Sequence, residues 1–360
     1  MTWNMFLQNM RGRSKAGSGG QGSLPCLFVL AAVLLAVSSC MLFGCAKGED
    51  GGSAKSDGKK QESSRAEDQN GRLHVVTTIF PQYDFVREIG GDNVSLQMLL
   101  KPGEETHSYE PTPRDILSIQ KSDLFIYVGG ENDAWVEDIL DSPEMGQVRT
   151  LRLVDCVDTL EEEHVEGMKE ERHMGHEDEE GEEDEHVWTS PKNVIQIAER
   201  ITEELVSLDP GRREEYEAGL EVFREELSAL DKQFRDVAES AAHKGRNILL
   251  FGDRFPFRYF AEEYGLQYYA AFPGCASDTE PSAAAMAFLI RKVKEEHLPV
   301  VLKMELSSDQ IANAVAEATG AEVRVFYSCH NLTAEQFEEG AGYLSMMQEN
   351  VETLKAALEE

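Results

Sequence analysis

The sequence predicts an α/β protein with two similar lobes, each a parallel-type sheet flanked by helices, joined by one long rigid helix. In both halves of the 360-residue chain, short runs rich in β-branched residues alternate with segments of helical periodicity. That alternation is typical of parallel strands connected by crossover helices. Between the halves, apolar residues recur at three- and four-residue steps over residues 212–242. This pattern predicts a helix about 45 Å long.

The N-terminal lobe is expected over residues 73–210. Its strands are recognised by β-branched residues, and its helices by apolar periodicity and by glycine or proline at their ends. The Asp209-Pro210-Gly211 sequence ends the last helix of this lobe. The expected elements are strand 73–79, helix 83–89, strand 94–100, helix 112–121, strand 123–128 and helix 191–208.

The linking helix is expected over residues 211–243 and the C-terminal lobe over residues 244–360. The second lobe repeats the alternation of the first, and its closing helix is expected to end near Glu359. The other expected elements are strands 247–251, 266–272, 299–304 and 323–327, and helices 257–264, 283–295 and 309–319.

Residues 1–45 have the features of a lipoprotein signal peptide. Three basic side chains lie between residues 11 and 15, an apolar run follows over residues 26–37, and the segment ends in Leu42-Phe43-Gly44-Cys45. Cleavage there leaves a lipidated Cys45, and Cys40 is a weaker candidate. The alternative is a retained membrane helix over residues 24–44. Residues 46–72, which are almost devoid of apolar side chains, predict a flexible tether. We therefore expect an extracytoplasmic protein, lipid-anchored to the cell membrane.

The charge of the chain is strongly negative, with 67 acidic and 34 basic residues and a formal net charge of −33. Such a surface repels nucleic acid and favours cations, so a nucleic-acid partner is not expected. A monomer is expected. The acidic residues concentrate in the loop 157–185, which contains His164, His173 and His176. One hypothesis is that this loop collects zinc weakly; the alternative is that it is only a solvated loop.

Three cysteines remain after the signal segment: Cys156, Cys275 and Cys329. In an oxidising compartment, an odd number allows at most one disulfide within the chain. Cys275 and Cys329 both follow expected strands of the C-terminal lobe, so they are the favoured pair. The alternative is that no disulfide forms.

Two loops of the N-terminal lobe carry histidines with the chemistry of metal ligands. His107 lies between an expected strand end and an expected helix start, and His186 directly precedes an expected helix. Ligands of open α/β sheets bind at the carboxyl ends of strands, and neutral imidazole is a favoured zinc ligand. A single histidine is more often structural, so neither residue is decisive alone.

These motifs resemble those of the cluster A-I metal-binding solute receptors, the zinc- and manganese-binding receptors of ABC importers. The resemblance covers residues 73–358 and implies two lobes with the metal buried between them. It also implies that His107 and His186 are ligands. The matching stretches are 79–83 with 89–91, 102–111, 123–130 with Trp135, 185–193, and 257–266.

The C-terminal lobe departs from the pattern of that family. Its zinc-binding members usually have a histidine a few residues before a Tyr-Phe pair, where this chain has Arg254, which cannot bind a cation. One extra loop residue would bring Asp253 to that position, so Asp253 is the predicted third ligand. The fourth is His330, in place of the usual aspartate. Glu305 is a further candidate. The alternatives are that Glu305 pairs with Arg254 and that His330 is solvent-exposed.

The predicted ligand set is therefore His107, His186, Asp253 and His330, which suits tetrahedral Zn²⁺. Mn²⁺ prefers more oxygen donors and is the weaker candidate, while copper and nickel remain open. The chain contains no His-Glu-x-x-His or Gly-x-Ser-x-Gly motif, so an enzyme is not expected. The predicted function is to bind a divalent metal ion and deliver it to an ABC transporter permease. The alternatives are a secreted zinc metalloenzyme, or a manganese receptor or adhesin of the same fold.

Overall fold

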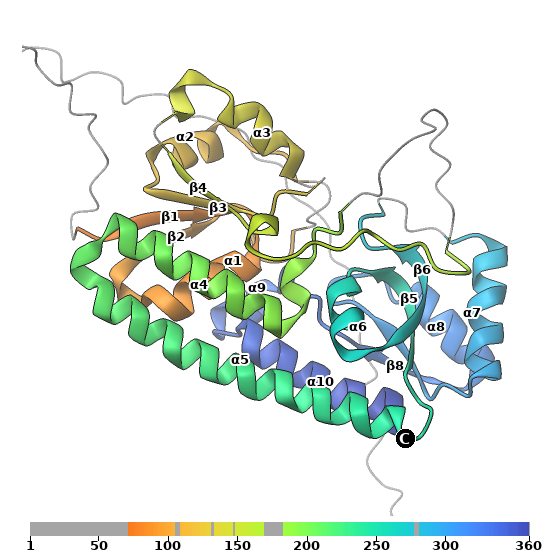
Figure 1. The fold of residues 1–360 in the computed structure, drawn as a ribbon. Helices are drawn as coiled ribbons and strands as arrows, with labels where there is room; N and C mark the ends of the chain where they lie inside the picture. Colours follow the sequence, from red (N-terminus) through yellow and green to blue (C-terminus); the bar gives the residue numbers. More distant parts are fainter. Residues whose placement is uncertain are drawn as a thin grey trace, which may run out of the picture. The chain divides into compact units, whose positions relative to one another are not determined.

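A four-stranded parallel sheet forms the centre of the N-terminal lobe (Figure 1). Its order is β2-β1-β3-β4, and β1 lies between two partners, with Val75 opposite Leu96 of β2 and Leu124 of β3. All four residues of β3 are buried, as expected for a parallel sheet covered on both faces. The strands are β1 (Leu73–Thr77), β2 (Val94–Met98), β3 (Leu124–Tyr127) and β4 (Arg149–Arg152).

A second parallel sheet, in the order β6-β5-β7-β8, forms the centre of the C-terminal lobe. In both sheets the chain starts at an inner strand, adds one neighbour, and then crosses to the other side. Ligands of such sheets bind where the strand order reverses, at the carboxyl ends of the strands. The strands are β5 (Ile248–Phe255), β6 (Gln267–Pro273), β7 (Val300–Lys303) and β8 (Glu322–Val325).

The computed structural model describes most of the chain, and Glu62–Glu360 form one compact unit. The described residues are 71–104, 109–130, 133–146, 148–168, 183–276 and 281–359. The expected signal peptide with Cys45 and nearly all of the expected tether lie outside these residues, as do His107, His173 and His176. Within the described ranges, we find no helix with the length and hydrophobicity needed to cross a bilayer.

Helices cover both sheets, and several begin at side-chain caps. Ser190 Oγ accepts a hydrogen bond from Asn193 N at the start of α4, and Ser282 caps α7 in the same way. The helices of the N-terminal lobe are α1 (Phe80–Gly90), α2 (Pro113–Lys121), α3 (Ala134–Leu140) and α4 (Pro191–Leu208). Those of the C-terminal lobe are α6 (Arg258–Tyr264), α7 (Ala283–Glu295), α8 (Gln310–Thr319), α9 (Ala334–Glu338) and α10 (Tyr343–Glu359).

The long helix α5 (Arg213–Ala242, 30 residues) packs against helices of both lobes. It contacts α1 and α4 of the N-terminal lobe and α6 and α10 of the C-terminal lobe (Figure 1). At Gly219, a Cβ would lie 2.3 Å from the carbonyl oxygen of Ile89, so only glycine permits this close approach to α1. One buried stripe runs along the helix and includes Tyr216, Phe223, Leu227, Leu230 and Phe234.

The structure confirms the predicted fold class. Helices α4 and α7 span the predicted residues, and β5 extends beyond its predicted end at residue 251 to Phe255. Two elements were not predicted: helix α3 and the short edge strand β4, which has an arginine at each end. The expected single closing helix is two helices, separated at Gly340, whose φ of 80° favours glycine.

The favoured disulfide between Cys275 and Cys329 is wrong. No disulfide joins any of the cysteines within the described ranges. The two residues follow β6 and β8, the outer strands of the C-terminal sheet, and β5 and β7 lie between them. Three strand spacings amount to about 14 Å, whereas the Cα atoms of a disulfide lie within about 7 Å.

Candidate metal centre

His186 is fully buried at the start of a short 3-10 helix, Val187–Thr189, which leads into helix α4. Its backbone N–H and its Nδ1 both lie within hydrogen-bond distance of Asp184 Oδ1, at 2.8 and 2.9 Å. Burial alone would lower the pKa of His186, but the neighbouring Asp184 carboxylate raises it, and the net effect is a raised pKa. A carboxylate at Nδ1 is the usual arrangement behind a metal-binding histidine, because it orients the ring and directs Nε2 to the metal. The local structure thus prepares His186 to bind a cation through Nε2.

Asp184 is itself held from the C-terminal lobe. The hydroxyl of Tyr259 in α6 donates a hydrogen bond of 2.6 Å to the carbonyl oxygen of Asp184. The same hydroxyl accepts a 3.2 Å bond from Leu160 N, and Asp184 N donates to the carbonyl oxygen of Leu160. The segment before His186 is therefore fixed by both lobes.

His330 lies on the loop after β8 and is buried, with 8% of its surface exposed. Its ring centroid is 4.8 Å from that of His186 and 4.9 Å from that of Trp188. The two histidines come from different lobes, so the sequence-based expectation that they converge holds for this pair. The alternative that His330 is solvent-exposed does not fit its burial.

Glu305 supports His330 through a serine. Its carboxylate accepts two hydrogen bonds of 2.7 Å from Ser328, one from the backbone N–H and one from Oγ. Ser328 Oγ also lies 2.8 Å from His330 Nδ1. Burial raises the pKa of Glu305 to about 7. Glu305 thus orients His330 through Ser328. The Arg254 guanidinium, which the alternative interpretation pairs with Glu305, donates a hydrogen bond of 3.5 Å to the carbonyl oxygen of Ala276.

Asp253 lies inside the extended strand β5 rather than on the loop after it. One carboxylate oxygen accepts a 2.8 Å bond from Arg254 N, and the other accepts a 3.0 Å bond from Met304 N and a bond from Ser307 Oγ. These bonds join the ends of β5 and β7. Metal binding by Asp253 would compete with them, and its role as a ligand stays a prediction.

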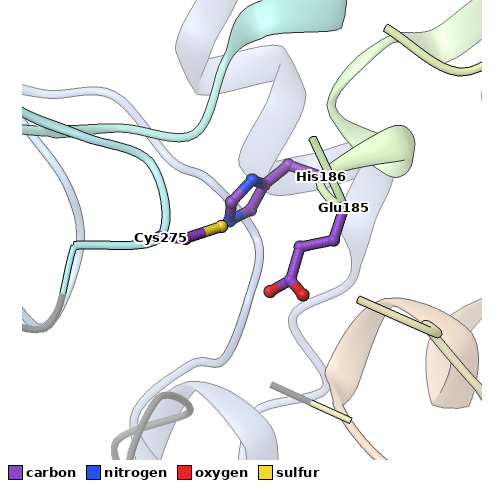
Figure 2. A group of neighbouring side chains, drawn as sticks. All are labelled: Glu185, His186 and Cys275. Carbon is purple, nitrogen blue, oxygen red and sulfur yellow. The ribbon is translucent and has the colours of Figure 1, made fainter. Parts of the chain in front are cut away.

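His186 also belongs to a group of potential metal ligands that differs from the predicted set. One donor atom each from Glu185, His186 and Cys275 lies within 4.8 Å of the others. Figure 2 shows the Glu185 and His186 side chains on neighbouring positions of one loop, and the Cys275 side chain approaching them from the loop after β6. Glu185 is buried and Cys275 is partly buried. Sequence reasoning did not consider either residue as a candidate ligand, although Glu185 adjoins His186 and Cys275 follows a strand at the ligand-binding edge of its sheet.

A cavity of about 10 Å³, which is about enough for one water-sized particle, is lined by Glu185 and His330. Part of its lining follows the carboxyl ends of β1 and β3, the two strands between which the strand order reverses. Burial raises the pKa of Asp133 to about 7, with the charge of Glu185 as a further cause. A cation in this region would relieve the mutual repulsion of its carboxylates. The lining residues are Thr78, Ile79, Tyr109, Val128, Asp133, Glu185, Trp188 and His330.

Two lobes with parallel sheets, a shared long helix and buried histidines that meet from both lobes define a two-lobed metal receptor. Comparison with known proteins agrees with this class. Residues 75–357 match the family described as "Zinc-uptake complex component A periplasmic", ZnuA. The chain belongs to this family of transport receptors, which is not a family of enzymes.

Individual relatives show the extent of the similarity. The chain is 33% identical over 335 residues to the high-affinity zinc uptake system protein ZnuA of Bacillus subtilis (strain 168), covering 92% of this chain and 97% of that protein. It is 30% identical over 298 residues to the zinc-binding lipoprotein AdcA of Streptococcus pneumoniae serotype 4, covering 82% of this chain and 58% of AdcA. The crystal structure of the Zn(II)-bound ZnuA-like domain of Streptococcus pneumoniae AdcA matches with a TM-score of 0.66 at 29% identity, covering 81% of this chain and all of that domain.

Proposed function

We propose that this protein is an extracytoplasmic receptor that binds one Zn²⁺ between its lobes and delivers it to an ABC transporter permease. The observation that carries the proposal is the convergence of His186 and His330, which come from different lobes with ring centroids 4.8 Å apart. Each ring has its Nδ1 near an oxygen atom, of Asp184 or Ser328, which favours Nε2 of each ring as the metal-binding atom.

His107 and Asp253 complete the proposed ligand set on sequence grounds alone. With His186 and His330 they would give three imidazoles and one carboxylate, which suits tetrahedral Zn²⁺ better than Mn²⁺. A set of protein ligands without an exchangeable water fits transport rather than hydrolysis. The names of the similar proteins from Bacillus subtilis and Streptococcus pneumoniae also favour zinc.

Hydrogen bonds between the lobes favour release of the metal by small movements of the lobes rather than by a wide opening between them. Trp188 Nε1 donates a 2.9 Å bond to the carbonyl oxygen of Ser328, and the Tyr343 hydroxyl donates a 2.8 Å bond to that of Trp188. Asn331 Nδ2 donates to the carbonyl oxygens of Lys101 and Glu104. Since α5 also packs on both lobes, we expect metal binding and release to involve shear between packed elements.

Lipid anchoring at Cys45 completes the proposal. A lipid on the new N-terminus, followed by the tether 46–72, would hold the receptor beside the membrane that contains its permease. The similar AdcA protein is named as a lipoprotein, which supports this reading. Labelling with a radioactive fatty acid, lost in Cys45→Ala, would test it; a labelled Cys45→Ala variant would reject Cys45 as the anchor site.

Metal binding is tested by thermal unfolding of the chelator-treated protein. A ligand in 1,000-fold excess over its Kd stabilises the folded state by about 4 kcal/mol, which corresponds to a rise in Tm of about 10 °C for a protein of this size. We expect this rise with zinc. An unchanged Tm with zinc, manganese, nickel and copper would reject the proposal.

A further inference from the structure

We propose that Cys275 binds the metal as a thiolate, alongside His186 and with Glu185 as an oxygen donor. This inference deepens the proposed zinc-receptor function and rests on it. It places a sulfur ligand from the C-terminal lobe in the position that the sequence-based ligand set gives to Asp253.

The distances among the three side chains fit one metal ion after a small adjustment. Zn–S bonds of about 2.3 Å and Zn–N bonds of about 2.0 Å place tetrahedral donor atoms about 3.5 Å apart. The donor atoms of Glu185, His186 and Cys275 lie within 4.8 Å of one another. Side-chain rotations that move the donor atoms by about 1 Å would bring them to binding distance. Figure 2 shows the Cys275 sulfur beside the His186 ring, with the Glu185 side chain next to them.

The loop that carries Cys275 is fixed against His186. A Cβ on Gly274 would lie 3.1 Å from His186 Cε1 and 3.1 Å from the carbonyl oxygen of Phe255, so the absence of a side chain lets the backbone approach the imidazole. Cys275 N donates a 3.1 Å hydrogen bond to Glu162 Oε1. The loop is therefore held from the N-terminal lobe side, and its thiol is placed beside the ring.

The surroundings of the group also favour a cation. Asp184 and Glu185, the two residues before His186, are buried, and Glu162 accepts a hydrogen bond from the Cys275 backbone. Buried carboxylates are stable when they are paired with positive charge or coordinate a metal. Asp253, which sequence alignment offered as the ligand from the C-terminal lobe, instead joins β5 to β7 through its hydrogen bonds. Besides His330, Cys275 is a donor that this lobe presents next to His186.

A sulfur ligand predicts the metal selectivity of the site. Thiolates select zinc and other thiophilic ions, whereas Mn²⁺ prefers oxygen donors. We expect the zinc affinity of Cys275→Ser to fall at least about tenfold, since changes even to outer-shell partners cost 10–100-fold. The preference for zinc over manganese should fall with it.

The test is zinc-edge X-ray absorption of the purified full chain loaded with one equivalent of zinc. We expect a sulfur shell at about 2.3 Å beside a nitrogen and oxygen shell at about 2.0 Å. Cys275→Ser should lose only the sulfur shell. Cys156→Ser is the matched control, because it removes another partly buried thiol, and it should retain the sulfur shell.

The possible results separate the two proposals. Bound zinc without a sulfur shell in the unmodified protein would overturn the role of Cys275 and leave the receptor function standing. A sulfur shell that persists in Cys275→Ser would likewise overturn it. A protein that binds no zinc would overturn both proposals.

Discussion

Removing the Asp184 carboxylate should weaken zinc binding without removing a predicted ligand. Asp184 Oδ1 is the acceptor for both the backbone N–H and the Nδ1 of His186, at 2.8 and 2.9 Å, and Asp184 is buried with 1% of its surface exposed. Asp184→Ala leaves both donors without this acceptor and frees the ring to rotate. Loss of such an outer-shell partner costs 10–100-fold in metal affinity, or about 1.4–2.7 kcal/mol.

Asp184→Asn should have a smaller effect. The amide retains one oxygen that can accept both hydrogen bonds, but it removes the negative charge, and charge-assisted bonds are roughly twice as strong as neutral ones. We therefore expect a loss of less than about tenfold for Asp184→Asn. The order of affinities should be wild type, then Asn, then Ala.

Competition against a fluorescent zinc chelator measures these affinities, and urea unfolding of the metal-free variants separates affinity from folding. The exposed Asp141→Ala is the control and should bind zinc like the wild type. If Asp184→Ala binds zinc within twofold of the wild type, Asp184 does not orient a metal-binding His186 and this reasoning is refuted.

Two further predictions concern the metal-free protein. Since burial raises the pKa of Asp133 from its ordinary value of 3.8 to about 7 in the folded protein, its contribution to stability is fully present below about pH 4 and is lost as pH rises through 7. Asp133→Asn should reduce the slope of the unfolding free energy against pH, between pH 5 and 8, by up to about 1 kcal/mol per pH unit. Urea unfolding at several pH values measures this slope, and equal slopes in the wild type and the variant would contradict the prediction. Trp188→Phe removes the Nε1 donor to Ser328 O and should cost about 1–3 kcal/mol of unfolding free energy. Trp135 Nε1 donates no hydrogen bond among the described residues, so Trp135→Phe should cost less unfolding free energy. Equal losses of unfolding free energy in the two variants would contradict the role of the interlobe hydrogen bond.

The helices with clear end signals were the most predictable part of the fold. Helix α4 begins at Pro191, after the Ser190 cap, and ends at Leu208, before Asp209-Pro210, as the sequence predicts. Strand β4 was missed because it is a short edge strand with an arginine at each end, without the apolar run of a central strand. The division of the closing helix at Gly340 depends on a backbone turn that periodicity does not reveal.

The site prediction rests on histidines that lie on loops next to a clear helix or strand end. His186 and His330 were selected in this way, and the structure brings their rings together, while their role as ligands stays a prediction. The extension of β5 to Phe255 places Asp253 within a strand, and a sequence alignment does not show that its oxygens bond to β7. Cys275 was interpreted as half of a disulfide because it and Cys329 both follow expected strands of the C-terminal lobe. The sequence does not show that Cys275 lies beside His186 of the other lobe.

The most direct test of the receptor proposal is the number of zinc ions retained per chain after dialysis, measured by mass spectrometry. We expect one ion in the wild type and in His164→Ala, because the His164 side chain is exposed in the acidic loop. We expect loss of that ion in His186→Ala and in His330→Ala. Retention of one tightly bound zinc ion by both variants would contradict a metal site formed where these two histidines meet.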